Sequence, residues 1–167
     1  QDRSLRDQFA ENVFTPFAGE TAVLAGDLSV TYGELDSISQ KLALNLWDLG
    51  LRPLDRVVVM LPNVIEFVYL YFALQKLGAI PICALATHRY HELGQFTEIA
   101  QAKAVFAPER QRDFEFAPMI ERVRGENGCL EQGVILGEAP GGFLSFADLL
   151  AREPAATRDV LDAIKID

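Results

Sequence analysis

The sequence is poor in the residues that build disulfide frameworks, zinc sites and redox centres. Its 167 residues include only two cysteines, two histidines and one tryptophan. Neither Cys83 nor Cys129 belongs to a C-x-x-C pair, which excludes a zinc knuckle and a thioredoxin-type site. Cys83 stands in the apolar run 80–85, where we expect a buried, unreactive thiol. We expect no disulfide between the two cysteines.

Long hydrophobic runs are also missing. The longest apolar run, at 64–74, contains Glu66 and is shorter than the roughly 18 residues that a membrane-spanning helix needs. The first residues of the chain carry no apolar signal-peptide core. We therefore expect a cytoplasmic protein with no membrane partner.

Positive charge is in deficit. The chain has 15 Lys and Arg against 24 Asp and Glu, a formal net charge of −9. An acidic surface repels nucleic-acid phosphates and anionic lipids, so we expect no nucleic-acid partner. Because half of the residues are hydrophobic and 23% are charged, the chain is expected to fold as an ordinary globular domain.

The first thirty residues predict a short helix followed by a β-hairpin. Leu5, Phe9 and Val13 recur at four-residue spacing and predict a helix over 4–13. Gly26-Asp27 lies between two short runs of strand-forming residues, a pattern typical of a two-residue hairpin turn.

A second helix has the clearest boundaries in the sequence. Thr31 and Glu34 have the spacing of a capping box, and Gly50 supplies the stop. The apolar stripe between them consists of Leu35, Ile38, Leu42, Leu46 and Leu49.

After Gly50, short β-branched runs alternate with helical stretches. Strands are predicted at 56–61, 80–85, 104–107 and 133–136, and helices at 64–77, 90–101, 118–124, 146–150 and 157–166. The first two strands read as buried on both faces. This alternation predicts an α/β fold with a mostly parallel sheet built from βαβ units. No stretch has the composition of a linker between two domains.

The common phosphate-binding and nucleophile motifs are absent. The sequence has no G-x-x-x-x-G-K-[ST], no G-x-G-x-x-G and no G-x-S-x-G. Gly141-Gly142 lacks the neighbours of a phosphate cradle, and we interpret it as a plain turn.

The two histidines are close together, at His88 and His91, and are followed by Glu92. These side chains suit zinc, but a third ligand is missing and a metal site is not expected. We interpret the segment as a loop leading into a helix. Because it follows a strand, where open α/β sheets bind ligands, a ligand-binding role stays open as an alternative.

The remaining chemistry-bearing side chains have structural interpretations. Aromatic residues all round one helix predict core packing rather than a ligand box: Phe67, Tyr69, Tyr71 and Phe72. Three helical carboxylates have cap or surface roles: Glu34, Asp36 and Glu66. From these patterns we assign no catalytic, cofactor-binding or metal-binding residue.

Three segments together resemble the acyl-adenylate-forming enzymes, which include acyl-CoA synthetases, luciferases and the adenylation domains of nonribosomal peptide synthetases. They are TYGELD at 31–36, LGLRPLDRVVVMLPN at 49–63 and FALQKLGAIP at 72–81. The first resembles the first core motif of the superfamily, and the third resembles the second core motif. The resemblance extends from about Leu5 to the end of the chain.

The segment ALATHRYHEL at 84–93 is similar to the aryl-acid branch of this superfamily, in particular to the 2,3-dihydroxybenzoate and salicylate adenylate synthases of siderophore biosynthesis. An acyl-CoA ligase and a peptide-synthetase adenylation domain remain alternatives. A non-enzymatic interaction domain is an alternative of another class.

The resemblance implies an ATP-dependent, AMP-forming ligase. ATP and an aryl acid give an aryl adenylate and pyrophosphate with the help of magnesium. The aryl group then passes to the phosphopantetheine thiol of an aryl carrier protein. Such chemistry needs positioned donors and a metal ion to stabilise the charge of the phosphate.

The residues that perform this chemistry in the superfamily are not found up to Asp167. The phosphate loop with its lysine, the acid-pocket motif, the acidic residue that holds the ribose and the catalytic lysine are all absent. We therefore expect residues 1–167 to be the N-terminal portion of the large domain of an AMP-binding ligase, inactive alone. ATP and magnesium are expected only in the parent enzyme. Uncovered strand edges are expected to favour self-association.

Overall fold

The computed structural model describes residues 5–165, which are divided between two units built from separate stretches of sequence. Unit 1 comprises the chain up to Pro53, Val64–Ala79, and the chain from Glu153 onward. Unit 2 comprises Leu54–Asn63 and Ile80–Arg152. Because the chain passes repeatedly between the units, no linker marks their boundary in the sequence.

Unit 1 begins with a helix whose register changes. The α-helix α1 (Leu5–Phe9) continues into the π-helical turn η1 (Ala10–Phe14). The predicted helix is confirmed over its described part, and residue 4 lies outside the described residues. Its predicted apolar face is correct only in part: Phe9 packs edge-on against Phe72 at 5.3 Å, but Leu5 is 58% exposed. Phe14, at the end of the π-turn, is buried instead, at 3% exposure.

The hairpin and the capped helix form as predicted. Strands β1 (Thr21–Ala25) and β2 (Leu28–Thr31) pair antiparallel around Gly26, which has φ 60°. Helix α2 (Tyr32–Asp48) starts at the capping box. There, Thr31 N–H donates to Glu34 Oε2 at 2.8 Å, and Glu34 N–H donates to Thr31 Oγ1 at 3.2 Å.

Helix α3 (Ile65–Leu77) packs along α2 within unit 1 and ends at Gly78, which has φ 72°. The predicted core packing of its aromatic residues is confirmed for Tyr69, which is buried, whereas Phe67, Tyr71 and Phe72 are half-buried. The Phe72 ring lies edge-on to Phe14 at 5.3 Å. The ammonium of Lys76 pairs with the Asp36 carboxylate of α2. This ion pair joins the two segments that resemble core motifs.

The end of the chain is attached to the same unit. The carboxylate of Asp48 accepts hydrogen bonds from the main-chain N–H groups of Ala155, at 2.6 Å, and Ala156, at 3.1 Å. Lys41 pairs with Glu153. Helix α7 (Asp159–Asp162) is shorter than the predicted helix at 157–166, and residue 166 lies outside the described residues.

Unit 2 contains a five-stranded sheet in which every neighbouring pair is parallel. Its strands are β3 (Arg56–Val59), β4 (Ile80–Cys83), β5 (Ala104–Pro108), β8 (Gln132–Leu136) and β9 (Leu144–Ser145), in the order β4-β3-β5-β8-β9. This confirms the predicted α/β fold class. The sequence prediction missed β9 and a small hairpin, β6 (Arg110–Gln111) with β7 (Phe114–Glu115).

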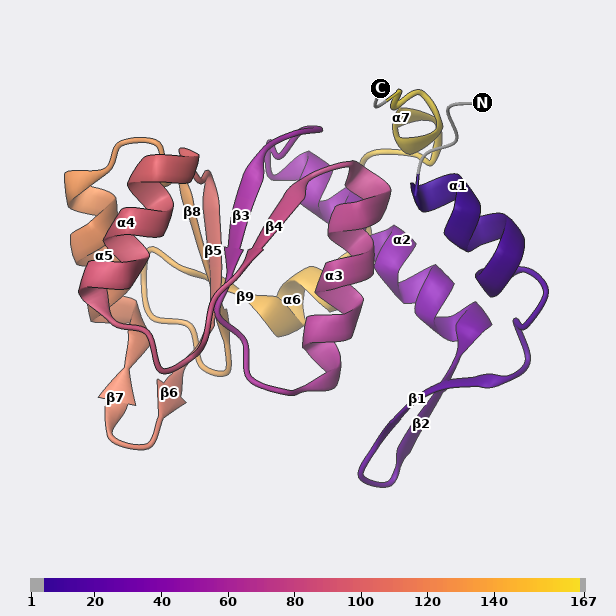
Figure 1. Ribbon diagram of the computed structural model, residues 1–167, viewed down its shortest axis with the longest axis horizontal. Helices are drawn as coiled ribbons and strands as arrows, with labels where there is room; N and C mark the ends of the chain where they lie inside the picture. Colours follow the sequence, from indigo (N-terminus) through magenta and orange to yellow (C-terminus); the bar gives the residue numbers. More distant parts are fainter. Residues whose placement is uncertain (1–4, 166–167) are drawn as a thin grey trace. The chain divides into compact units, whose positions relative to one another are not determined.

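Helices cover both faces of this sheet (Figure 1). On one face lie α4 (Tyr90–Ala100) and α5 (Phe116–Glu126), and they build one core with the strands. That core includes Val58, Val105, Ile135, Leu93, Phe116 and Ile120. On the other face, Phe106 packs edge-on against Phe146 of α6 (Phe146–Ala151), with ring centroids 5.6 Å apart.

Two predictions about strand β4 are wrong. It lies at the sheet edge with only β3 as a neighbour, so it is not buried on both faces, and Ile80 is 43% exposed. Cys83 is exposed rather than buried. Both cysteines are free in the structure.

The free edge of β4 offers few hydrogen-bond donors. Ile80 and Ala84 donate their main-chain N–H groups toward β3. Because main-chain groups alternate in direction along a strand, the N–H groups of the odd-numbered residues point toward the free edge. Pro81 has no N–H, and the N–H of Leu85 donates to His88 Nδ1. These features weaken strand addition at this edge, and self-association of the chain stays a prediction.

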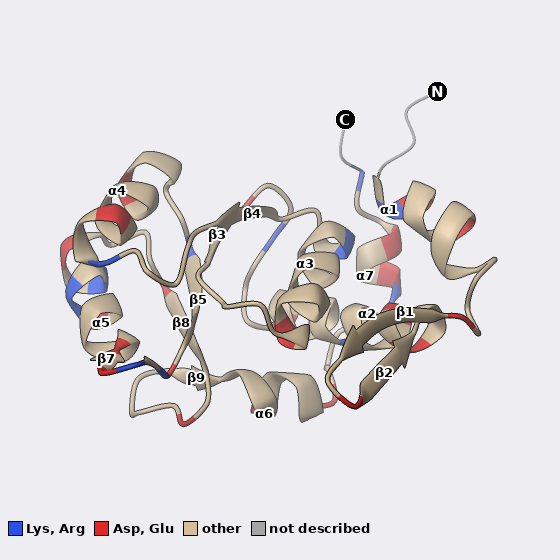
Figure 2. Ribbon diagram, turned by 60° about the horizontal axis from the view of Figure 1, so that its bottom comes forward, with Lys and Arg blue, Asp and Glu red and all other residues tan. Residues whose placement is uncertain are grey.

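The charged residues lie mainly on helices and loops, and the strands of the parallel sheet are almost free of them (Figure 2). Among residues 5–165, no helix has both the length and the apolar character needed to cross a membrane.

The cap of α2 gives a prediction about acid stability. Hydrogen bonds from the main chain and the hydroxyl of Thr31 hold the pKa of Glu34 below its ordinary value. The carboxylate is favoured in the folded state, so its contribution to stability is complete at neutral pH and is lost as the pH falls through this lowered pKa. In urea unfolding followed from neutral to acidic pH, Glu34→Gln should therefore lose less stability than the parent chain.

The matched control is Glu131→Gln, which changes an exposed carboxylate in unit 2. It should follow the pH dependence of the parent chain. Identical pH dependence for Glu34→Gln and the parent chain would contradict the role assigned to the cap.

Candidate functional site at the carboxyl edge of the sheet

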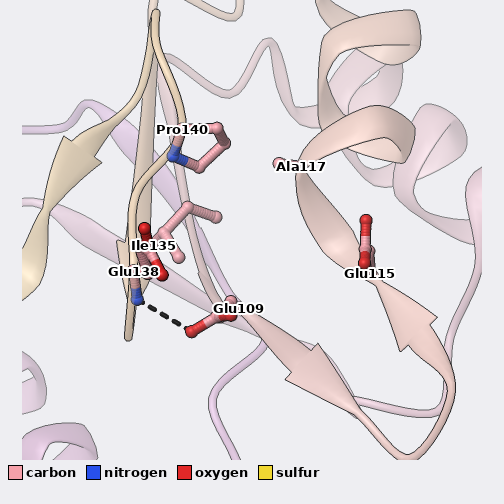
Figure 3. Close-up of a pocket in the computed structure, with 6 residues that line it drawn as sticks. All are labelled: Glu109, Glu115, Ala117, Ile135, Glu138 and Pro140. Atoms are coloured by element: carbon pink, nitrogen blue, oxygen red, sulfur yellow. Dashed lines mark hydrogen bonds between the residues drawn. The ribbon is translucent and has the colours of Figure 1, made fainter.

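The carboxyl ends of β5 and β8 border a hollow of about 200 Å³ (Figure 3). Ligands of open parallel sheets bind at this edge, which makes the hollow the first candidate site. It is lined by Glu109, Glu115, Ala117, Ile135, Glu138 and Pro140.

Glu109 organises the floor of the hollow. It directly follows β5, and its Oε2 accepts a hydrogen bond from the main-chain N–H of Glu138 at 2.8 Å (Figure 3). Gly137, which lies between β8 and Glu138, has φ 120°. A Cβ atom at Gly137 would lie 2.6 Å from Glu109 Oε2. Residue 137 is therefore restricted to glycine by its backbone conformation and by the approach of Glu109.

The hollow is acidic. Three of its lining side chains are the carboxylates of Glu109, Glu115 and Glu138, and only Glu115 has a cationic partner nearby, Arg110. Such a field repels the phosphates of a nucleotide and the carboxylate of an organic acid. The lining contains no histidine, cysteine, serine or lysine. The hollow therefore lacks the groups that acid activation needs.

The topological switch point of the sheet lies one strand away. The strand order reverses between β3 and β5, and ligands of doubly wound sheets bind at such a reversal. The residues that follow β3 there, Met60 and Leu61, are buried and apolar, and Met60 N–H donates to Phe106 O at 2.8 Å. This end of β3 packs against β5 instead of offering polar groups.

The histidines predicted to lie after a strand are found in the loop between β4 and α4. His88 is half-buried, accepts from Leu85 N–H at 3.2 Å, and packs against the Phe96 ring at 5.4 Å. His91 is exposed on α4. Across residues 5–165, no group of three or more His, Cys, Asp and Glu side chains is arranged to hold a metal ion.

Glu92 acts as a cap rather than as a ligand. Its carboxylate accepts from Arg89 N–H at 2.9 Å, and this hydrogen bond, together with one from the main chain of Glu92 itself, lowers the pKa of Glu92.

The other carboxylates considered from the sequence lie in unit 1. Glu34 caps α2 and Asp36 pairs with Lys76. Burial raises the pKa of Tyr69, and the nearby charges of Glu66 and Glu34 add to this rise. The buried phenol therefore stays neutral at physiological pH, and these groups form no acid/base pair.

The glycine pair is a turn, as predicted. Gly142 has φ 88°, and its carbonyl accepts from Arg124 Nη1 at 3.1 Å. Sequence patterns did not identify the hollow. The signal that points to it is a carboxylate within two residues of the end of each of two parallel strands, namely Glu109 after β5 and Glu138 after β8.

Comparison with known proteins identifies the family. Residues 10–158 match the family of AMP-binding enzymes, and the chain belongs to that family. This confirms the resemblance to the acyl-adenylate-forming superfamily.

Its relatives include enzymes that activate aryl acids. The chain is 36% identical over 156 residues to the 2,3-dihydroxybenzoate-AMP ligase of Bacillus subtilis (strain 168), covering 93% of this chain and 28% of that protein. It is 35% identical over 127 residues to the salicyl-AMP ligase / salicyl-S-ArCP synthetase of Mycobacterium tuberculosis, covering 76% of this chain and 22% of the relative. The chain thus spans less than a third of the length of either relative.

A solved structure shares the fold. The anthranilate CoA ligase AuaEII, in complex with anthranoyl-AMP, superposes with a TM-score of 0.79 at 26% identity. The superposition covers 93% of this chain and 29% of that one.

The close approach at Gly137 yields a stability prediction. Gly137→Ala should lower the free energy of unfolding by about 1–3 kcal/mol, because it strains the backbone and collides with Glu109. Chemical denaturation monitored by circular dichroism measures this loss.

Gly142→Ala is the matched control, because its φ is also positive but no atom lies within 4 Å of the added Cβ. It should lose less than Gly137→Ala. Equal losses in the two variants would show that the contact with Glu109 adds nothing.

Proposed function

We propose that the chain is the N-terminal portion of the large domain of an aryl-acid adenylating ligase. The observation that carries the proposal is the similarity to 2,3-dihydroxybenzoate-AMP ligase over 93% of the chain. The name of the mycobacterial relative points to the same substrate class, a hydroxylated aromatic acid.

The proposed reaction has two steps. An oxygen of the aryl carboxylate attacks the α-phosphorus of ATP, the bond to the β-phosphate breaks, and pyrophosphate leaves with the aryl adenylate formed. A thiol then attacks the acyl carbon, giving a thioester, AMP and a proton. The first step is needed because a free carboxylate is a poor electrophile, whereas AMP is a good leaving group.

The acidic hollow and the sequence motifs of this chain do not fit ATP. The hollow at the sheet edge is lined by three carboxylates, and no loop of the sequence has a phosphate-binding pattern. The proposal therefore assigns the phosphate loop, the magnesium ligands and the reacting groups to the rest of the ligase. The 167-residue chain supplies scaffold and is expected to be inactive alone.

The acceptor is the less specified part of the proposal. We favour the phosphopantetheine thiol of an aryl carrier protein, because the name of the mycobacterial relative includes transfer to ArCP. Coenzyme A is the second candidate, because the structural relative AuaEII is a CoA ligase. Both acceptors present the same thiol chemistry.

Acid-dependent ATP–pyrophosphate exchange by the ligase that contains this chain tests the proposal. 2,3-Dihydroxybenzoate and salicylate should stimulate exchange, while fatty acids and amino acids should not. Exchange stimulated only by fatty or amino acids would overturn the substrate class. No exchange with any acid would favour a non-enzymatic role.

A further inference from the structure

The loop between β4 and α4 is closed by its own histidine. Leu85 N–H donates to His88 Nδ1 at 3.2 Å, and His88 N–H donates to Leu85 O at 3.0 Å. The ring also packs against Phe96. These contacts hold the imidazole in one orientation.

Arg89 holds the same loop from its other side. Its Nη1 donates to Ala86 O at 2.9 Å and to His88 O at 2.8 Å. The guanidinium carbon lies 4.1 Å from the centroid of the Phe114 ring, on strand β7. A planar, delocalised guanidinium suits this combination of two carbonyls and an aromatic face, whereas a lysine ammonium does not reproduce it.

The arrangement leaves one nitrogen of His88 available. Because Nδ1 accepts a hydrogen bond, the neutral imidazole carries its proton on Nε2. Within the described part of the chain, Nε2 has no hydrogen-bond partner. A half-buried donor with fixed orientation and no protein partner stands beyond the carboxyl end of β4, on the edge of the sheet where ligands bind.

We propose that His88 Nε2–H donates a hydrogen bond to an acceptor oxygen of a substrate of the adenylation step, and that Arg89 is the residue that positions His88. This inference rests on the proposed function and adds a specific residue to it. Oxygen acceptors occur on the aryl acid and on the phosphates of ATP, and kinetics distinguishes these two sources.

His88→Asn in the ligase separates a substrate role from a structural role. The Asn side-chain oxygen can still accept the hydrogen bond of Leu85 N–H, but no atom replaces Nε2. The KM for one substrate, the aryl acid or ATP, should rise about tenfold, the effect of losing one hydrogen bond. The substrate whose KM rises is the one that His88 contacts.

His91→Asn is the matched control, because His91 is the neighbouring histidine and its side chain is exposed. It should leave both KM values unchanged. Parent-like kinetics for His88→Asn in an active ligase would overturn this inference alone. A ligase that shows no exchange with any acid would overturn the proposed function as well.

Nitrogen-15 NMR of the 167-residue chain tests the geometry without activity. At pH about 8, where an imidazole is neutral, His88 should show the Nε2–H tautomer in the parent chain. Arg89→Ala should shift its signals toward a mixture of tautomers, and Arg89→Lys should not restore them. An unchanged His88 spectrum in Arg89→Ala would overturn the positioning role of Arg89.

Discussion

The ion pair between Lys76 and Asp36 is the interaction on which unit 1 depends. The Lys76 side chain is only 10% exposed, and a buried ammonium group is costly unless a carboxylate accompanies it. The ring of Phe14, 4.7 Å from the ammonium, adds a cation–π contact. The pair therefore fixes α3 on α2 and places both against the N-terminal helical turn.

This ion pair also joins the two core-motif segments of the chain. Asp36 belongs to the first of these segments and Lys76 to the second, so both are used to assemble the fold. In unit 2, the parallel sheet likewise contributes architecture: its carboxyl edge presents an acidic hollow, built on Glu109 and Gly137, rather than cations for a nucleotide. We infer that this part of the ligase positions chemistry that other residues perform.

Sequence patterns predicted the features that depend on neighbouring residues. The Thr31–Glu34 cap, the stop of α2 before Gly50 and the alternation of strands and helices are local, and all are found. The burial of β4 was predicted wrongly, because a strand's place at a sheet edge depends on the order of strands far apart in sequence. The π-turn before Thr15 had no sequence signal.

In the candidate sites too, local features were predicted from the sequence and contacts between distant residues were not. The histidine loop was found from the sequence because it follows a predicted strand. The contact between Glu109 and Glu138 joins two strand ends 29 residues apart, and no local sequence pattern predicts it. The orientation of His88 depends on Arg89 and on a ring from the small β6–β7 hairpin, which is too short to be recognised in the sequence.

Calorimetric titration of the isolated 167-residue chain with ATP·Mg and salicylate tests the central claim most directly. The claim is that this chain provides the scaffold of an adenylating ligase and none of its reacting groups. We expect a folded chain, verified by circular dichroism, that gives no saturable heat and forms no salicyl adenylate, under conditions in which the ligase containing it does both. Saturable binding or turnover by the isolated chain would contradict the claim.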